Sequence, residues 1–235
     1  MRAVQPRTAN ADVSFGSDPS GARLANAVFD NPNWNWTTFD FDQNAALLDR
    51  VLSPIINATN PDLSGFRARG GKLLMTQGWA DALNAQTLPI EYFNNVLLSE
   101  DSLTSEVDYF RLFMAPGMSH CGGGPGPNSI GGGVPPVNIT PERDTTAALE
   151  AWVEQGQAPD SLISTKYVND TPPTVQREIR LCYYPRVMVL TGGDPTQAGS
   201  YVCRNDNEAF ATDLQQESKN VATDLSTGQI ANLPN

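Results

Sequence analysis

The sequence has no apolar run long enough to cross a membrane, and it has few basic residues. No stretch approaches the roughly 20 apolar residues of a membrane-spanning helix, and residues 1–7 lack the apolar core of a signal peptide. Fifteen lysine and arginine residues stand against 26 aspartate and glutamate residues, which gives a net charge of −11. Such a charge repels nucleic-acid phosphates and anionic membranes. We therefore expect a chain without an export signal that binds neither nucleic acid nor membrane.

Histidine is scarce, because the chain contains only one, His120. This residue follows the apolar stretch 107–114 after a short loop. Histidine is the usual proton shuttle near neutral pH, and open α/β sheets place their chemistry at strand ends. If the chain uses an imidazole in catalysis, His120 is therefore the only candidate.

Cysteine is also scarce, with three residues in the chain. Between Cys182 and Cys203, two short β-rich runs flank a turn at 191–195, and such a hairpin brings both thiols within bridging distance. We predict a disulfide between them, with buried free thiols as the alternative. Cys121 is then an odd cysteine that needs a partner from elsewhere. No Cys-x-x-Cys pair occurs and Cys121 adjoins His120, so we expect no zinc site.

The centre of the chain has the pattern of a parallel α/β unit. An apolar run from residue 73 ends in a glycine-containing turn, and Asp81 lies just past that predicted strand. Residues 86–99 have helical spacing, and residues 108–114 form a second apolar run whose end leads to His120. The sequence therefore predicts a strand–helix–strand crossover of a parallel sheet, with Asp81 and His120 on adjacent strand-end loops.

Three further segments carry predictions of their own. The glycine- and proline-rich tract 122–136 lacks the Gly-Lys-Ser/Thr end of a phosphate loop and predicts a flexible surface loop. A helix is expected with Thr140 as its N-cap and Gly156 at its end. Residues 43–56 also look helical, and one last short helix is expected after residue 204.

Asp81 and His120, 39 positions apart, have the chain order of the last two members of a Ser-Asp-His triad. In that role Asp81 accepts the imidazole Nδ1–H, and His120 takes a proton from a serine. The alternative is that Asp81 and His120 are ordinary solvated residues on surface loops. No Gly-x-Ser-x-Gly motif occurs, and the adjacency of Ser119 to His120 disfavours it as nucleophile. A hydrolase with an unrecognised nucleophile stays open, with these candidates: Ser64, Ser99, Ser102 and Ser119.

Several motifs follow one another along the chain. They are Asp30-Asn-Pro-Asn-Trp34, Phe39-Asp-Phe41-Asp42, Asp62-Leu63, Gly70-Gly71-Lys72-Leu73-Leu74, Gly78-Trp79-Ala80-Asp81, the run from Asp108 to Gly126, the run from Leu149 to Asp160, and the segment from Cys182 to Cys203. Together they resemble the tannase and feruloyl esterase family, to which the bacterial hydrolase of mono(2-hydroxyethyl) terephthalate is also similar. The resemblance covers about residues 28–205.

The resemblance implies an α/β-hydrolase that cleaves small esters of phenolic or aromatic acids such as gallate and ferulate, without a cofactor. Asp81 and His120 match the family's triad acid and base. Cys121 matches the cysteine that bridges to one beside the nucleophilic serine. Many members carry a lid with a calcium site, but its Asp-rich loop is not found here, so we expect no metal. The resemblance also implies a secreted or periplasmic protein.

The family's serine elbow and oxyanion-hole segment are not found in this sequence, so we expect them in an amino-terminal half preceding residue 1. Residues 1–60 then resemble the loop-rich end of the lid, and residues 61–235 the carboxyl-terminal part of the catalytic domain. The expected fold is a partial α/β-hydrolase fold with a mostly parallel sheet. The leading hypothesis is a carboxylic ester hydrolase that holds the Asp and His of its triad here. The alternative is a truncated or degenerate fragment that catalyses nothing.

Overall fold

The computed structural model describes residues 28–31, 33–100 and 108–205. The chain forms two compact units, residues 1–58 and 59–235. Ser102 lies outside the described residues. The short helix expected after residue 204 also lies outside them, because the description ends at residue 205. In the described part of the chain, no helix has both the length and the apolar character that a membrane span requires.

The first unit contains a short 3-10 helix, η1 (Trp36–Thr38), and the helix α2 (Gln43–Ile56), as the spacing of residues 43–56 predicts. Its aromatic side chains pack on one another. Phe29 stacks on Trp34 with ring centroids 4.3 Å apart, and Phe39 packs edge-on against Phe41 at 5.0 Å. The assignment of residues 1–60 to the end of a lid stays a prediction.

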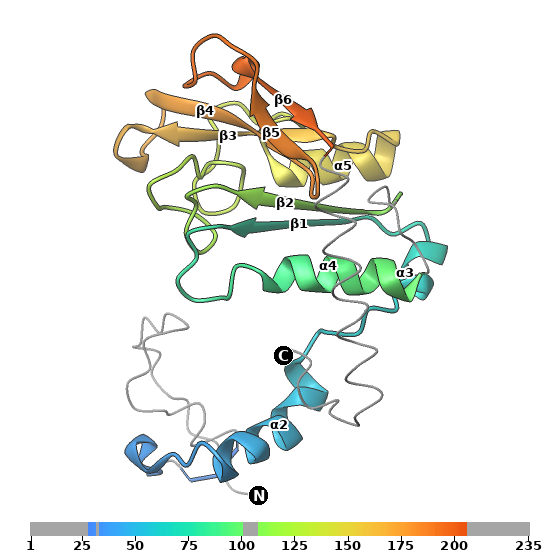
Figure 1. Cartoon of the computed structure of the whole chain (residues 1–235), viewed down its shortest axis with the longest axis vertical. Coiled ribbons are helices and arrows are strands. Elements are labelled where there is room, and N and C mark those ends of the chain that lie inside the picture. Colours follow the sequence, from blue (N-terminus) through green and yellow to red (C-terminus); the bar gives the residue numbers. More distant parts are fainter. Residues whose placement is uncertain (1–27, 32, 101–107, 206–235) are drawn as a thin grey trace, which may run out of the picture. The chain divides into compact units, whose positions relative to one another are not determined.

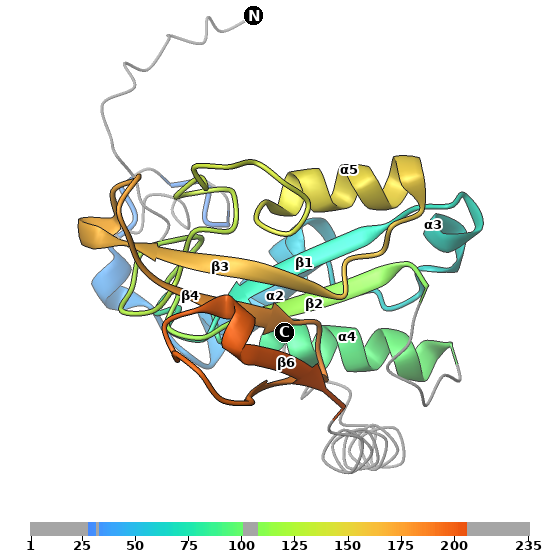
Figure 2. The same ribbon diagram turned by 90° about the horizontal axis from the view of Figure 1, so that it is seen from above.

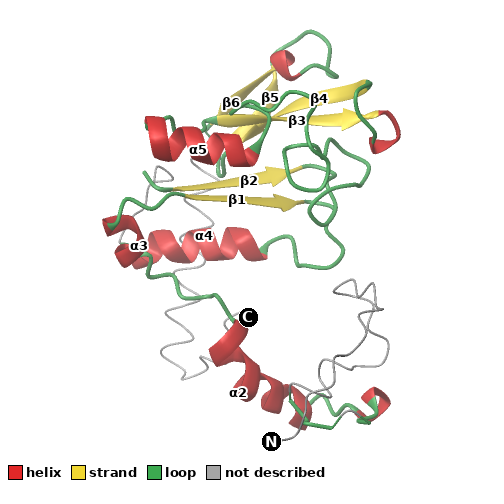
Figure 3. Cartoon of the chain, turned by 180° about the vertical axis from the view of Figure 1, so that it is seen from behind, coloured by secondary structure: helices red, strands yellow, loops and turns green. Residues whose placement is uncertain are grey.

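The second unit alternates helices and strands along the chain (Figure 1). Its helices are α3 (Ser64–Ala68), α4 (Leu88–Ser99) and α5 (Thr145–Gln155), with the short 3-10 helices η2 (Val168–Asp170) and η3 (Ala198–Ser200). Its strands are β1 (Leu73–Gly78), β2 (Phe110–Ala115), β3 (Ser161–Tyr167), β4 (Val175–Cys182), β5 (Val187–Leu190) and β6 (Tyr201–Arg204). Figure 3 separates the helices, strands and loops by colour. This mixture confirms an α/β chain.

Strands β1 and β2 pair in parallel, as predicted, in a register that runs from Leu73 opposite Phe110 to Gly78 opposite Ala115. Helices α4 and α5 lie on opposite faces of this pair, as Figure 1 and Figure 2 both show. Covering both faces buries β2 almost completely, which is why its sequence is a nearly continuous apolar run. Both strands end at the same edge, so the loops that follow them start side by side.

Two antiparallel hairpins follow the parallel pair. Strand β3 pairs with β4, and β5 pairs with β6, with Met188 opposite Cys203. The predicted disulfide between Cys182 and Cys203 is confirmed, with Cα atoms 5.6 Å apart. It joins the end of β4 to β6. An isolated bridge between Phe113 and Tyr183 connects β2 to the segment after β4.

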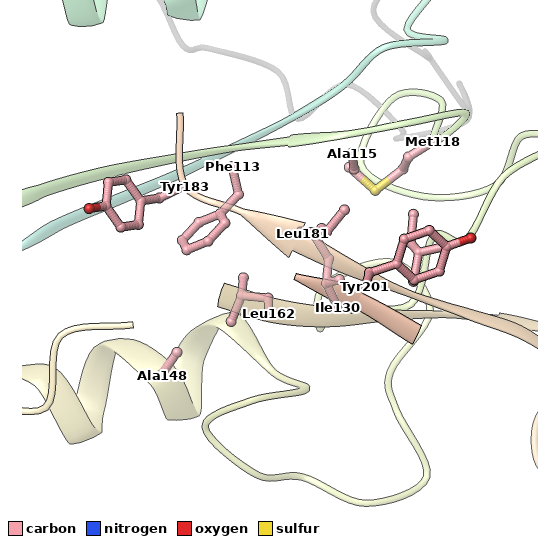
Figure 4. Packing of buried hydrophobic residues seen from close by; sticks show 10 residues of the cluster. Phe113, Ala115, Met118, Ile130, Ala148, Leu162, Leu181, Tyr183 and Tyr201 are labelled. Atoms are coloured by element: carbon pink, nitrogen blue, oxygen red, sulfur yellow. The ribbon is translucent and has the colours of Figure 1, made fainter. Parts of the chain in front are cut away.

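The core between the parallel pair and the hairpins contains side chains from β2, β3, β4, β6 and α5 (Figure 4). Its members are Phe113, Ala115, Met118, Ile130, Ala148, Leu162, Ile179, Leu181, Tyr183 and Tyr201. Each large side chain that is fully buried here stabilises the fold by about 1.5–3 kcal/mol. Met118 belongs to the loop that carries His120, so the core anchors that loop two residues before the imidazole.

The structure corrects three predictions. The sheet is not mostly parallel in the described residues, because β1 and β2 pair in parallel whereas the other two strand pairs are antiparallel. The tract 122–136 is not simply a flexible surface loop, because residues 127–131 are buried and Ser129 bridges to Thr165 of β3. The N-cap of α5 is Asp144, not Thr140, because the Asp144 carboxylate accepts from the N–H groups of Thr146 and Ala147. Thr140 instead accepts from two N–H groups in the turn before the helix. Gly156 ends the helix in the left-handed conformation, as predicted.

Candidate active site

The loops after β1 and β2 are held together by backbone hydrogen bonds. Trp79 N–H donates to Ala115 C=O at 3.0 Å, and Ala80 N–H donates to Met118 C=O at 2.9 Å. These bonds continue the parallel pairing past the last paired residues. They bring the Asp81 loop directly beside the His120 loop.

Gly78 permits this close approach. A Cβ atom at this position would overlap the carbonyl oxygen of Met118 and lie 2.6 Å from the carbonyl oxygen of Ser119. Both obstacles are backbone, so they cannot turn aside as a flexible side chain would. The glycine in the Gly-Trp-Ala-Asp motif is therefore required by packing between the two loops.

We expect Gly78→Ala to lower the free energy of unfolding by about 1–3 kcal/mol, the usual cost of overpacking a closely packed site. Urea unfolding followed by circular dichroism measures this change. Gly199→Ala is the matched control, because a Cβ at Gly199 meets no atom within 4 Å. The control should change stability by less than about 0.5 kcal/mol. Equal stabilities for both variants would contradict the assigned role of Gly78.

The two candidate residues meet across the loops. His120 Nδ1 lies 2.9 Å from Asp81 Oδ2. The Asp81 side chain is 3% exposed, whereas the His120 side chain is 39% exposed. The arrangement places a buried carboxylate behind an imidazole that solvent or a substrate can reach.

The Asp81 carboxylate has further partners besides His120. Its Oδ1 atom accepts from the N–H groups of Leu83 at 2.8 Å and Asn84 at 3.1 Å, and Oδ2 accepts from Gln77 Nε2 at 2.9 Å. Burial alone would raise the pKa of Asp81, but the hydrogen bonds from His120, Leu83, Asn84 and Gln77 outweigh it and hold the pKa well below the usual range. Asp81 is therefore ionised at neutral pH.

An ionised Asp81 fixes the proton on the imidazole. Because a carboxylate only accepts, His120 Nδ1 must donate to it, and Nε2 is then the free base of the neutral ring. Asn84 Nδ2 lies 3.4 Å from the same Nδ1, but a protonated nitrogen cannot accept, so this contact is no hydrogen bond in that tautomer. Within the described residues, no side chain bonds Nε2. A basic nitrogen is thus available to take a proton.

The described candidate serines do not complete a triad. The Ser99 hydroxyl donates to the carbonyl oxygens of Val96 and Pro61, and the Ser64 hydroxyl interacts with Asp62. Ser119 precedes His120 directly, and this adjacency disfavours it as the nucleophile. Cys121 is exposed and free, in a left-handed conformation with φ of 60°.

Gln77 was not anticipated from the sequence, although a polar residue near the end of an apolar strand is a usable signal. Its amide donates to the Asp81 carboxylate from four positions earlier in the chain.

The described ranges contain no group of three or more His, Cys, Asp or Glu side chains that could hold a metal ion.

Comparison with known proteins gives consistent matches. The family model described as tannase and feruloyl esterase matches residues 8–204. An uncharacterized esterase from Xanthomonas campestris is 38% identical over 221 residues, which covers 83% of this chain and 38% of that protein. A probable feruloyl esterase B-2 from Aspergillus terreus is 36% identical and covers 75% of this chain and 34% of that protein.

Solved structures are similar as well. A crystal structure of an esterase from Aspergillus oryzae aligns with a TM-score of 0.70 at 32% identity, covering 78% of this chain and 37% of that one. Feruloyl esterase B from the same organism aligns with a TM-score of 0.68 at 31% identity, covering 77% of this chain and 36% of that one. The chain thus spans between a third and two-fifths of the length of these relatives.

Proposed function

Because the chain belongs to the tannase and feruloyl esterase family, we propose that it supplies the acid and the base of a Ser-His-Asp carboxylic ester hydrolase. The observation that carries the proposal is the pair formed by Asp81 and His120. A buried, ionised carboxylate orients an exposed imidazole and leaves Nε2 as the base. The second unit then corresponds to the carboxyl-terminal part of an α/β-hydrolase catalytic domain.

In the proposed reaction, His120 Nε2 takes the proton of a serine hydroxyl while the serine oxygen attacks the ester carbonyl carbon. The tetrahedral intermediate expels the alcohol, which receives the proton from the imidazolium, and an acyl-enzyme remains. In the second half, water gives a proton to Nε2 and attacks the acyl carbon. The tetrahedral intermediate then releases the acid, while the imidazolium returns the proton to the serine oxygen. Asp81 stabilises the imidazolium in both halves.

The proposed nucleophile is a serine that does not belong to this sequence. The absence of a Gly-x-Ser-x-Gly motif from the chain and the bonding of Ser64 and Ser99 to other groups support this assignment. The proposed partner of Cys121 is a cysteine next to that serine, and the exposed free thiol beside His120 is available for it. Both would belong to an amino-terminal half of the enzyme.

The proposed substrates are small esters of phenolic or aromatic acids. Two apolar side chains flank Asp81 and are exposed, Trp79 at 45% and Leu83 at 51%. Exposed apolar groups next to polar catalytic atoms are typical of sites that bind aromatic ligands. The names of relatives as feruloyl esterases support the same substrate class.

We further propose an oxidising location, either extracellular or periplasmic. The disulfide between Cys182 and Cys203 supports it, because such bonds persist mainly outside the reducing cytosol.

The first test uses the 235-residue chain alone, for which we expect poor hydrolysis of methyl ferulate and methyl gallate. Without the nucleophilic serine of the triad, His120 and Asp81 can at best activate water. A fluorophosphonate probe followed by peptide mapping should label none of its serines. Labelling of Ser64, Ser99, Ser102 or Ser119 would place the nucleophile in this chain and overturn the assignment. Robust turnover that His120→Gln abolishes would also contradict it.

The second test is a chimeric esterase in which this chain replaces the matching segment of the Xanthomonas relative. We expect it to hydrolyse the same esters and to be labelled on a serine of the Xanthomonas part. A folded chimera with neither activity nor label would favour the alternative, a fragment that catalyses nothing.

A further inference from the structure

A lysine far from His120 in sequence holds the loop that follows it. The Lys166 side chain, near the end of β3, is 13% exposed. Its ammonium donates to the carbonyl oxygen of Gly124 at 2.6 Å and to Asp170 Oδ1 at 2.6 Å. Burying a lysine costs rotamer entropy and hydration, so these two bonds must hold it in a defined place.

Asp170 is itself fixed. Asn128, which is 1% exposed, donates from Nδ2 to Asp170 Oδ1 at 2.7 Å. Asn169 and Asp170 both adopt left-handed conformations, with φ of 55° and 54°, which residues other than glycine adopt only at some cost. The hydrogen bonds from Asn128 and Lys166 lower the pKa of Asp170, so the carboxylate stays charged. Lys166, Asp170 and Asn128 form what we call the lysine clamp.

The lysine clamp reaches the His120 turn through two glycines. Gly123 C=O accepts from Ser119 N–H at 3.1 Å, and this bond closes the turn that contains His120. The next residue, Gly124, packs so closely that a Cβ there would overlap Gly117 C=O and lie 2.8 Å from Ser119 Oγ. A shift of Gly124 would therefore displace the backbone of Ser119 and with it that of His120.

This turn needs an external anchor. The residues from Gly122 to Gly126 include four glycines, and glycine loses more conformational freedom on folding than any other residue. Apart from Pro125, which is exposed, such a segment has no side chains of its own to pack against the core. A charge-assisted hydrogen bond to Gly124 C=O supplies the missing restraint, since such bonds are about twice as strong as neutral ones.

We propose that Lys166 is a positioning residue that, through Gly124, holds the His120 turn so that Nδ1 stays within hydrogen-bond distance of Asp81. The catalytic consequence rests on the proposed function; the geometric one does not. Lys166 acts through backbone and does not touch the reacting atoms. Asp170 and Asn128 act one step further away, by fixing the ammonium.

The test is NMR of the imidazole in the full 15N-labelled chain, where the single histidine gives one pattern. In the neutral ring of the wild type, the proton should lie on Nδ1. Lys166→Met should raise the share of the Nε2–H form and speed exchange of the Nδ1 proton by roughly tenfold, the effect of losing one charge-assisted bond. Lys166→Arg keeps a cation with several donors and should restore most of the wild-type pattern.

Lys72→Met is the matched control. Lys72 also donates to a backbone carbonyl, that of Asp108 at 2.8 Å, but it lies before β1, at the other end of the parallel pair. It should leave the imidazole pattern unchanged. Asp170→Asn is a second variant at a half-exposed position, should Lys166→Met fail to fold, and it should shift the pattern in the same direction.

A folded Lys166→Met or Asp170→Asn protein with the wild-type tautomer and exchange rate would overturn the proposal. The measurement uses no ester, so a failure of the proposed function would leave its result unaffected. In the chimeric esterase, Lys166→Met should lower kcat roughly tenfold and change KM little, because substrate contacts are kept while the base is misplaced.

Discussion

Asp81→Asn in the chimeric esterase should lower kcat/KM for methyl ferulate by about 10,000-fold, the loss seen when an asparagine replaces a triad aspartate. An asparagine amide can donate to Nδ1, which favours the tautomer with the proton on Nε2. In that form His120 cannot accept a proton from the serine. Loss of the negative charge also removes the stabilisation of the imidazolium.

The pH dependence sharpens this prediction. The hydrogen bonds to Asp81 keep its pKa well below the usual range, so its carboxylate is ionised throughout the neutral region. Titration of the Asp81 carboxylate should therefore contribute no step to the wild-type profile of kcat/KM between about pH 6 and pH 8. Stopped assays of kcat/KM at several pH values measure it.

The control is Asp108→Asn, which changes an exposed carboxylate at the start of the segment leading into β2. Asp108 pairs with Arg67 and its side chain is 69% exposed. Its replacement should change kcat/KM less than twofold, because exposed ion pairs contribute little to stability. If Asp81→Asn lost no more activity than Asp108→Asn, the assignment of Asp81 as the triad acid would be wrong.

Removal of the disulfide should have the largest effect on stability. Cys182 and Cys203 close a loop with a sequence separation of 21 residues. The bond lowers the conformational entropy of the unfolded chain. For a loop of this length, that effect stabilises the fold by about 3 kcal/mol. The double variant Cys182→Ala, Cys203→Ala should lose that stability, which corresponds to a fall in Tm of roughly 6–12 °C.

Thermal and urea unfolding without reductant measure this loss, and Cys121→Ser serves as the control. Cys121 is exposed and free, so its replacement should change Tm by no more than about 2 °C. Wild type treated with dithiothreitol should behave as the double variant does. A double variant as stable as the wild type would show that the bond does not restrain the unfolded chain.

The sequence predicts those parts of the site that depend on local pattern. The apolar runs and the glycine turn locate β1, β2 and the loops that carry Asp81 and His120. Parallel strands end at one edge, so their proximity follows from the topology alone. The sequence also predicts the disulfide, because a recognisable turn separates β5 from β6 and brings Cys203 back towards Cys182.

Other features depend on contacts that no local pattern encodes. The tract after Cys121 is rich in glycine and proline, the usual signature of a surface loop, yet tertiary pairing of Ser129 with Thr165 buries part of it. Lys166 lies 42 positions from Gly124, and nothing in the spacing relates them. The cap of α5 was misplaced because Thr140 and Asp144 are both good N-cap residues, and only the folded turn decides between them.

The register of β1 against β2 has a geometric consequence for the chemistry. Sliding one strand past the other by a single residue would displace the loops by about 3.3 Å and reverse which face each side chain occupies. A displacement of that size exceeds the 2.9 Å that separates His120 Nδ1 from Asp81 Oδ2. The strand register from Leu73 to Gly78 thus fixes the distance between His120 and Asp81, although both residues lie beyond the paired strands.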